Sequence, residues 1–458
     1  MPGSIPAPEK YTAVLPGLAP AGMQNAYPAY RHDRSNEVWC SGDLQRMREL
    51  RQWVLACFFL LLPQWAMAQQ RTLIATWTAS AMAADPDPAE PLLKIDGQTV
   101  RERARVSIGG SRICIRLTNE YGSTPLVIGS ATVATPIDAS SVKPGSIRTV
   151  TFGGRTSITI PAGAPALSDP VDFSIAPGAE ISLSLYFPQR VATPTLHSLA
   201  LKRAVVSLHG DQTRAEKIEG GAITESSVAF SAVLVPAQPA QRLVVAFGDS
   251  LVDGDKSTVD ADRNWPSDLV RRLGKTARDS RLAVVNEGIA GNRLLSDGFG
   301  TNGLARFDRD ALAIPGVTHI VLLEGINDIS FPGAKLGGEY LADPADMRSA
   351  EDVIQAYRQL IFRAHARGIK LIGATMTPCE GMVLPGYYSE SKEALRQTVN
   401  KWIRTSGAFD GVIDFDAVLR DPDHPSRVLP RLASPDHLHP TDAGYQAMAD
   451  AIDLNLFR

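Results

Sequence analysis

The alternation of apolar and polar residues changes character near residue 240. From residue 71 to residue 235, short runs alternate apolar and polar positions and are separated by Gly, Pro, Ser and Asn, as in the run ISLSLYF at 181–187. A period of two with frequent turn residues is typical of antiparallel strands with one buried face. We therefore expect an antiparallel β-sandwich or jelly roll over residues 69–235.

Beyond a linker at 236–242, the pattern predicts an α/β domain over residues 243–458. Five apolar runs have strand character, at 243–247, 282–286, 319–323, 370–375 and 411–415. Apolar stripes at helical spacing lie between them, one made of Val353, Ile354, Tyr357, Leu360, Ile361 and Ala364, and another beginning with Leu395, Val399 and Trp402. Strands that alternate with helices predict a parallel sheet covered on both faces, with ligands bound at the carboxyl ends of its strands.

The segment before the β-domain has the features of a targeting signal. Arg48 and Arg51 follow Met47, residues 54–62 are apolar, and the sequence 66–68 has the small-x-small form that signal peptidase accepts. This apolar run is about half of the ~20 residues that a membrane-spanning helix needs. We therefore expect a cleaved signal peptide at 47–68, no stable membrane anchor afterwards, and export to the periplasm or the medium. Residues 1–46 are then a disordered extension or a mis-assigned start.

Composition and motifs exclude several functions. A formal net charge of −3 provides no basic surface for a nucleic-acid backbone, so we expect no nucleic-acid partner. The sequence contains no His-Glu-x-x-His, Cys-x-x-Cys or P-loop motif, which argues against a zinc protease, a redox protein and a nucleotidase. Cys114 and Cys379 remain after signal removal, and export permits a disulfide between them without requiring one. The oligomeric state leaves no mark in the sequence.

Candidate catalytic residues come after the predicted strands. Ser250 follows the first strand in FGDSLVDG, Gly291 follows the second in GIAGNRLL, and Asn327 follows the third in EGINDI. Asp436 and His439 follow the fifth strand, after a longer loop, in DHLHP. Because the carboxyl ends of parallel strands meet at one edge of a sheet, we expect these five residues to converge.

These residue types fit ester hydrolysis through a serine nucleophile. His439 can take the proton of Ser250, and Asp436, placed three residues earlier on an expected helical turn, can orient the imidazole. The backbone N–H groups of Ser250 and Gly291 and the side-chain amide of Asn327 can form an oxyanion hole. Taken singly, Ser250 is typical of a helix N-cap, Gly291 of a turn and Asn327 of a loop or cap. The order of the candidate residues along the chain and their common placement after strands favour catalysis instead.

The four stretches resemble those of the SGNH hydrolases, also called GDSL hydrolases, over roughly residues 242–456. The resemblance implies a flavodoxin-like three-layer α/β/α domain with a shallow, open site, and carboxylic-ester hydrolysis without a cofactor or metal. It also implies a triad of Ser250, Asp436 and His439. The β-domain, with TWTAS at 76–80 and RLTNEYG at 116–122, is similar to a secreted bacterial subgroup that includes arylesterases, acylhydrolases and acetylxylan esterases.

We therefore expect a secreted serine esterase that removes short acyl groups, above all acetyl, from carbohydrate esters through an acyl-enzyme on Ser250. Its substrate would be a small-molecule or polysaccharide ester. A lipase-like or lysophospholipase-like acylhydrolase, an arylesterase and an acyltransferase remain open alternatives. An alternative of another class is a non-catalytic carbohydrate-binding surface protein, since the β-domain is large for a spacer.

Five further residues have competing interpretations. Asp253 and Asp255 are more typical of a solvated loop than of a charged entrance to the site. His437 is more typical of a rim or packing residue than of a metal ligand. Trp77 and Trp265 fit the core better than a platform for a sugar ring.

Overall fold

The computed structural model describes residues 72–84, 94–275 and 281–458. The expected signal peptide at 47–68 and the extension before it lie outside the described residues. Within the described ranges, no helix is both long enough and apolar enough to cross a membrane.

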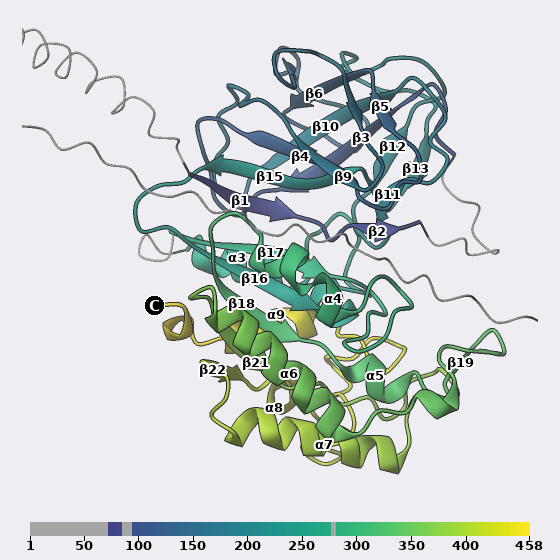
Figure 1. The fold of residues 1–458 in the computed structure, drawn as a ribbon, viewed down its shortest axis with the longest axis vertical. Helices are drawn as coiled ribbons and strands as arrows, with labels where there is room; N and C mark the ends of the chain where they lie inside the picture. The colour runs from purple at the N-terminus through teal and green to yellow at the C-terminus, as the bar shows by residue number, and fades with distance from the viewer. Residues whose placement is uncertain (1–71, 85–93, 276–280) are drawn as a thin grey trace, which may run out of the picture. The chain divides into compact units, whose positions relative to one another are not determined.

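Antiparallel sheets build the N-terminal β-region, defined here as residues 72–236, as the alternating pattern predicts (Figure 1). One sheet has the order β1 (Leu73–Thr78), β15 (Phe230–Pro236), β4 (Cys114–Asn119), β9 (Ala164–Leu167). A second has the order β13 (Ala222–Thr224), β12 (Ala204–Val206), β3 (Gln98–Arg105), β10 (Glu180–Phe187), β6 (Ser130–Ala134), β7 (Arg148–Thr149). Smaller sheets are β14 (Ser227–Val228), β11 (Thr195–His197) and β2 (Met82–Ala83), and the pair β5 (Leu126–Ile128) and β8 (Ile158–Ile160).

Strand β10 illustrates how the period of two builds the core. Its apolar face consists of four fully buried residues: Ile181, Leu183, Leu185 and Phe187. The serines between them point to the opposite face. That face is covered as well, because Arg101 of β3 is buried and donates from Nε to the hydroxyl of Ser184 at 2.9 Å. The polar half of the alternation therefore marks a buried face, with Ser184 hydrogen-bonded in it, and not a wet surface.

A five-stranded parallel sheet forms the centre of the α/β region, residues 242–458, and confirms the predicted fold class. Its order is β17 (Leu282–Gly288), β16 (Arg242–Gly248), β18 (Val317–Leu323), β21 (Lys370–Ala374), β22 (Gly411–Ile413). Counted along the chain, this is the 2-1-3-4-5 order of flavodoxin-like folds. The direction of winding reverses at β16, and in sheets of this kind ligands bind outside the carboxyl ends of the strands at the point of reversal.

Helices and short turns connect and cover these strands. The helices are α2 (Ser250–Asp253), α3 (Trp265–Leu273), α4 (Gly303–Phe307), α5 (Ile326–Ser330), α6 (Ala350–His365), α7 (Glu390–Thr405), α8 (Phe415–Leu419) and α9 (Asp442–Ala451). A π turn (Asp308–Leu312), two 3-10 turns (Pro344–Asp346 and Leu454–Phe457) and the hairpin β19 (Lys335–Leu336) and β20 (Glu339–Tyr340) complete the elements.

Of the two apolar stripes predicted at helical spacing, one is fully buried and the other only in part. All six residues of the first stripe are buried on α6, so that prediction is confirmed. On α7 only Val399 of the predicted stripe is fully buried, and Leu395 and Trp402 are half-buried. The inner face of α7 is partly polar because Arg396 lies there and donates from Nη1 to Asp416 Oδ1 at 2.7 Å. The spacing of apolar residues cannot predict a buried ion pair of this kind.

The β-region and the α/β region lie against each other. Pro236 ends β15 and Arg242 begins β16, so only residues 237–241 lie between the two strands, and residues 71–458 form one compact unit. Hydrogen bonds also cross the boundary, because Ser107 Oγ accepts from the backbone N–H of Val284 at 2.8 Å. The division into two independent domains at residues 235 and 243 stays a prediction.

The two cysteines in the described residues are not bonded to each other. Cys114 lies in β4 and Cys379 lies in the loop after β21, and both are buried free thiols. The disulfide that export would permit is therefore not formed in this structure.

Burial of Glu102 in β3 makes the free energy of unfolding depend on pH. Its Oε2 accepts from Ser227 Oγ at 2.6 Å and from the backbone N–H of Val228 at 3.1 Å, while Oε1 has no partner among the described residues. Burial outweighs these two hydrogen bonds and raises the pKa of Glu102 to about 8. The folded chain keeps a proton that the unfolded chain releases near pH 4, so the free energy of unfolding falls as the pH rises from about 4 to about 8.

We expect the substitution Glu102→Gln to raise the Tm by a few degrees more at about pH 8.5 than at about pH 5.5, because an amide needs no proton to stay neutral. Thermal unfolding at both pH values measures the difference. Glu219→Gln, at a side chain that is 77% exposed, is the matched control and leaves the difference unchanged. An equal gain at both pH values for Glu102→Gln would show that Glu102 is ionised in the folded state.

Candidate active site

Three neighbouring strands of the parallel sheet end at the same level. Gly248 at the end of β16 pairs with Gly288 at the end of β17 and with Leu323 at the end of β18. The residues that follow these strands therefore begin from one edge, as the sequence pattern predicts. Gly248 must be glycine, because a Cβ built there would lie 1.9 Å from the carbonyl oxygen of Leu323.

Ser250 is the first residue of the short helix α2, and its hydroxyl does not cap that helix. The cap is Asp249, whose side chain accepts from the backbone N–H of Leu251 at 2.9 Å. The interpretation of Ser250 as an N-cap is therefore wrong. Its side chain is 5% exposed, and the hydroxyl is available to the neighbouring histidine.

His439 and Asp436 complete a hydrogen-bonded series with Ser250. His439 Nε2 lies 2.8 Å from Ser250 Oγ, and His439 Nδ1 lies 2.8 Å from Asp436 Oδ2. The other carboxylate oxygen of Asp436 accepts from the Ser434 hydroxyl and from the backbone N–H groups of Leu438 and His439. All four side-chain heteroatoms of Asp436 and His439 are thus hydrogen-bonded.

The backbone between Asp436 and His439 differs from the expected helical turn. The segment is a loop, with the intervening His437 at φ +62°, in the left-handed region. The tight turn is held by Asp436 Oδ1 itself, which accepts the two backbone N–H groups downstream. An aspartate that caps its own turn produces the same side-chain juxtaposition as one turn of helix, which explains why the spacing was informative although the element was wrong.

The charge of Asp436 is firmly held. Burial opposes its ionisation, but the hydrogen bond and positive charge that His439 can supply outweigh burial and lower the pKa of Asp436 well below its usual range. An ionised Asp436 accepts the Nδ1 proton of His439, so Nε2 of the neutral imidazole carries a lone pair toward Ser250 Oγ. This arrangement suits a general base for the serine hydroxyl.

Two backbone N–H groups face the same edge without acceptors. Gly291 has φ +73°, and neither its N–H nor that of Ser250 has a hydrogen-bond acceptor in the part of the chain that the structure describes. Uncommitted backbone donors beside a nucleophile are what an oxyanion hole requires. A Cβ built on Gly291 would lie 2.8 Å from Cδ2 of Phe299, so a larger residue does not fit there.

Asn327 in α5 is held with one amide proton in use. The hydroxyl of Tyr387 donates to Asn327 Oδ1 at 3.0 Å, which fixes the amide so that Nδ2 points the other way. Nδ2 donates one proton to the carbonyl oxygen of Asn292 at 2.9 Å. An amide nitrogen carries two protons, so a second donor remains for an oxyanion. Tyr387 was not predicted from the sequence. Its one distinguishing sequence feature is that a second tyrosine, Tyr388, follows it.

Asp328 ties the loop after β17 to the loop after β18. Its two carboxylate oxygens accept from the backbone N–H groups of Leu294 at 2.6 Å and Leu295 at 2.8 Å. Burial outweighs these bonds and raises the pKa of Asp328 to about 6. The stretches GIAGNRLL and EGINDI are therefore fastened together twice, once by Asn327 and once by Asp328.

Two buried carboxyls, those of Asp249 and Glu324, have raised pKa values. Burial raises the pKa of Asp249 to about 7 against the opposing hydrogen bond from Leu251, and burial raises that of Glu324 well above its usual value. The buried guanidinium of Arg306 pairs with Glu324, with Nη2 3.4 Å from Oε2. Neutral carboxyls repel a developing oxyanion less than carboxylates do.

The remaining candidates are placed as follows. Asp253 is buried at the end of α2, so its interpretation as part of a solvated loop is wrong, whereas Asp255 is partly exposed, with Oδ2 3.6 Å from His439 Nε2. His437 is exposed, and the described residues contain no cluster of His, Cys, Asp and Glu suited to a metal ion. Trp265 is fully buried, and Trp77 packs on Phe230 with ring centroids 4.3 Å apart.

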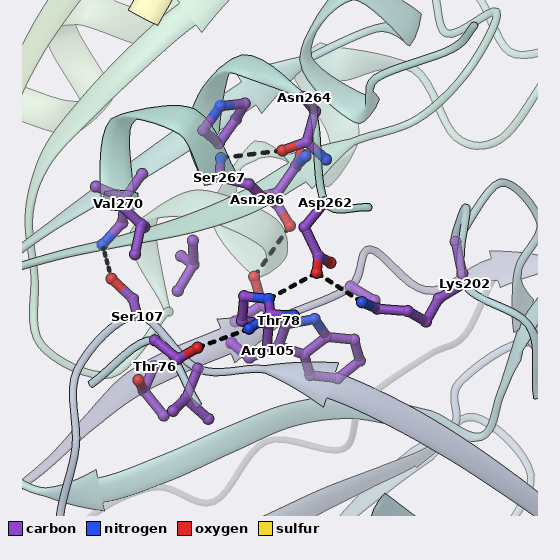
Figure 2. Close-up of a pocket in the computed structure, with 18 of the residues that line it drawn as sticks. Thr76, Thr78, Arg105, Ser107, Lys202, Asp262, Asn264, Ser267, Val270 and Asn286 are labelled. Atoms are coloured by element: carbon purple, nitrogen blue, oxygen red, sulfur yellow. Dashed lines mark hydrogen bonds and ion pairs between the residues drawn. The ribbon is translucent and has the colours of Figure 1, made fainter. Parts of the chain in front are cut away.

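A cavity of about 760 Å³ lies at the boundary of the two regions, away from the triad (Figure 2). Its walls include Thr76, Trp77 and Ser107 of the β-region, and Asn286 and Val270 of the α/β region. Arg105 and Lys202 point toward Asp262 at its edge, each 2.6 Å from the carboxylate. Ser250, Asp436 and His439 are not among its lining residues, so this cavity is not the candidate active site.

Comparison with known families decides the class of the α/β region. Residues 246–447 match the model of the GDSL-like lipase/acylhydrolase family. This part of the chain belongs to that family. The GDSL-like domain contains all the predicted site residues, and membership confirms the predicted family and the general class of carboxylic-ester hydrolase. The roles of the individual residues stay predictions.

Solved structures resemble the GDSL-like domain at low identity. A GDSL-like lipase from Bacteroides thetaiotaomicron is 18% identical, with 48% of this chain and 91% of that chain covered and a TM-score of 0.34. The aryl esterase of M. smegmatis is 16% identical, with 46% and 96% covered and a TM-score of 0.35. A carbohydrate acetylesterase from Sinorhizobium meliloti is 15% identical, with 46% and 96% covered and a TM-score of 0.34. Among curated proteins, none matches the chain.

Proposed function

We propose that this protein is an exported serine esterase that removes short acyl groups, above all acetyl, from carbohydrate esters. The observation that carries the esterase proposal is the series of 2.8 Å contacts from Ser250 through His439 to Asp436, beside uncommitted N–H donors. The signal-like segment at 47–68 supports export. The similarity of the β-region to a secreted bacterial subgroup that includes acetylxylan esterases, beside arylesterases and acylhydrolases, supports the substrate class.

The first half of the reaction forms an acyl-enzyme. Ser250 Oγ attacks the carbonyl carbon of the ester while His439 Nε2 takes the hydroxyl proton. The carbonyl oxygen becomes an oxyanion, which accepts from the backbone N–H groups of Ser250 and Gly291 and from the amide of Asn327. When the tetrahedral intermediate collapses, the C–O bond to the alcohol breaks, and His439 returns the proton to the departing alcohol.

The second half repeats these steps with water. His439 Nε2 takes a proton from a water molecule, whose oxygen attacks the acyl carbon on Ser250. Collapse of the second intermediate releases the carboxylic acid and returns the proton to Ser250 Oγ. Asp436, ionised across the working pH range, stabilises the imidazolium that forms twice in each cycle.

Phe299 favours a small acyl group. Its ring packs against the backbone of Gly291, whose N–H is one of the proposed oxyanion donors, and its centroid lies 6.0 Å from that of Phe331. An aromatic wall this close to the reacting carbonyl leaves more room for a methyl group than for a long alkyl chain. The proposal is therefore for acetyl in preference to fatty acyl groups.

We expect kcat/KM for p-nitrophenyl acetate to exceed that for p-nitrophenyl octanoate by roughly 10-fold or more, with release of acetate from acetylated xylan. Phe299→Ala is expected to lower the ratio of kcat/KM for the acetate ester to kcat/KM for the octanoate ester, because it removes the aromatic ring beside Gly291. The matched control is Phe362→Ala on the outer face of α6, at a residue that is 72% exposed, which leaves the ratio unchanged. A wild-type preference for octanoate would instead support a lipase-like acylhydrolase.

A further inference from the structure

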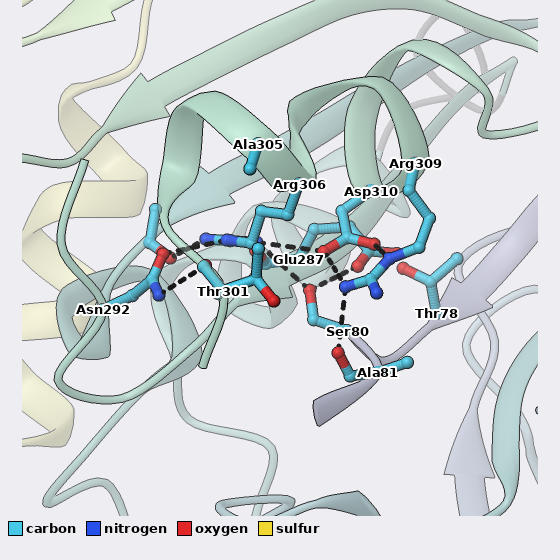
Figure 3. Close-up of polar contacts among 12 residues, drawn as sticks. Thr78, Ser80, Ala81, Glu287, Asn292, Thr301, Ala305, Arg306, Arg309 and Asp310 are labelled. Atoms are coloured by element: carbon cyan, nitrogen blue, oxygen red, sulfur yellow. Dashed lines mark hydrogen bonds and ion pairs between the residues drawn. The ribbon is translucent and has the colours of Figure 1, made fainter. Parts of the chain in front are cut away.

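The β-region reaches into the α/β region next to the proposed oxyanion hole. Ser80, the last residue of TWTAS, is 1% exposed and donates from Oγ to Glu287 Oε2 at 2.5 Å. Figure 3 shows Ser80 on the strand of the β-region with its hydroxyl directed toward Glu287 and Arg306. Arg306 Nη1 lies 3.3 Å from Ser80 Oγ, so the hydroxyl both donates and accepts across the boundary.

Arg306 connects Ser80 to the end of the strand before Ser250 and to the turn that contains Gly291. It is fully buried, and its partners at 2.9 Å or less are the carbonyl oxygen of Glu287 at 2.8 Å, the carbonyl oxygen of Gly248 at 2.7 Å and Oδ1 of Asn292 at 2.9 Å. Gly248 stands two residues before Ser250, and Asn292 directly follows Gly291. One guanidinium therefore fixes the end of the nucleophile strand relative to the turn that presents the second backbone donor.

His197 of β11 supplies a second route from the β-region. Its Nδ1 lies 3.1 Å from the carbonyl oxygen of Ser80, and its Nε2 lies 3.1 Å from Oδ1 of Asp253. The other oxygen of Asp253 accepts from the backbone N–H of Ala290 at 3.0 Å. Asp253 ends the helix that Ser250 begins, and Ala290 directly precedes Gly291. Both routes thus converge on the turn at residues 289–292.

The two partners of His197 determine where its protons lie. The Ser80 carbonyl can only accept, and the Asp253 carboxylate accepts when it is ionised, so one proton is held between His197 Nε2 and Asp253 Oδ1. Burial alone would lower the pKa of His197, but the neighbouring Asp253 outweighs burial and raises it. The pair is 4% to 9% exposed, which shields this bond from water.

We propose that Ser80 and His197 of the β-region are positioning residues for ester hydrolysis, which hold the turn carrying Gly291 in register with Ser250. The inference rests on the proposed function, because the turn matters only if it presents an oxyanion donor. It gives the β-region a part in the reaction and assigns a role to the TWTAS stretch. A shift of the turn weakens a bond made mainly in the transition state, so it lowers kcat more than it raises KM.

Two isosteric substitutions at His197 separate positioning from mere packing. The amide nitrogen of glutamine lies near the position of histidine Nε2, and that of asparagine near Nδ1. His197→Gln therefore keeps a donor for Asp253 and loses the one for Ser80, whereas His197→Asn keeps the donor for Ser80 and loses the one for Asp253. We expect His197→Asn to lower kcat on p-nitrophenyl acetate by roughly 10- to 100-fold at nearly unchanged KM, and His197→Gln to retain most of kcat.

The full chain is used throughout, with Tm measured on each variant. Ser80→Ala, the second test, is expected to lower kcat by about 10-fold at nearly unchanged KM. Arg105→Gln, which removes another contact across the boundary, to Asp262, is the control and leaves kcat unchanged. Wild-type kcat in both His197→Asn and Ser80→Ala would overturn the inference, as would equal losses in the Asn and Gln variants. A wild-type protein without ester hydrolysis would overturn the proposed function instead.

Discussion

Replacing Ser250 by alanine is expected to lower kcat on p-nitrophenyl acetate by roughly 10⁴-fold or more, because among the described residues Ser250 carries the only hydroxyl that is hydrogen-bonded to His439 Nε2. Initial rates measured with matched protein concentrations and corrected for spontaneous hydrolysis give the ratio. The substitution removes one oxygen atom from a side chain that does not cap α2, since Asp249 does. The variant should therefore keep its Tm, and the loss reports chemistry and not unfolding.

Asp436→Asn is the informative companion to Ser250→Ala. It leaves His439 and the oxyanion donors in place, so a residual rate well above that of Ser250→Ala is expected. The amide oxygen takes the place of Oδ1, which accepts three hydrogen bonds, so the amide nitrogen faces His439 Nδ1 and favours the wrong imidazole tautomer, which lowers the rate. Hydrolysis by Ser250→Ala at the wild-type rate would refute the assignment of the nucleophile.

Removing the amide of Asn327 is expected to give the next largest effect. Asn327→Ala should lower kcat by about 100- to 1000-fold with little change in KM, because the lost hydrogen bond is made mainly to the developing oxyanion. Steady-state kinetics on p-nitrophenyl acetate separates the two parameters. Asn327→Asp keeps the shape of the side chain but replaces both N–H donors by an oxygen, so it should be at least as damaging.

A purely ground-state role of Asn327 would give a different result. If KM rose while kcat stayed at the wild-type value, the amide would bind substrate without stabilising the oxyanion. Tyr387→Phe refines the test, because it keeps the ring but removes the bond that orients Asn327 Oδ1. We expect it to lower kcat less than Asn327→Ala does.

The fold could be predicted from sequence because its signals are local. Each of the five predicted parallel strands overlaps an observed one, since an apolar run between turn residues is specified within a few positions. The buried polar and charged side chains were not predicted. Arg396 on α7 and Arg101 behind β10 are buried by partners far away in the chain, and no local pattern reveals such partners.

The candidate site divides in the same way. Ser250, Gly291, Asn327, Asp436 and His439 all follow strands, so their order along the chain predicted their convergence. Ser80, His197 and Tyr387 act through hydrogen bonds that span 56 to 226 residues, and only the folded structure brings their partners together. The spacing of Asp436 and His439 was informative for the wrong element, because a loop with left-handed His437 replaces the expected helical turn.

The most direct test of the central claim is to trap the acyl-enzyme. Wild-type protein is mixed with p-nitrophenyl acetate, quenched rapidly in acid and digested, and the acetylated peptide is located by mass spectrometry, with Ser250→Ala as the blank. The account predicts an acetyl group on Ser250 that forms as fast as p-nitrophenol is released and is absent from the blank. Turnover without any adduct on the Ser250 peptide, equally fast in the blank, would contradict it.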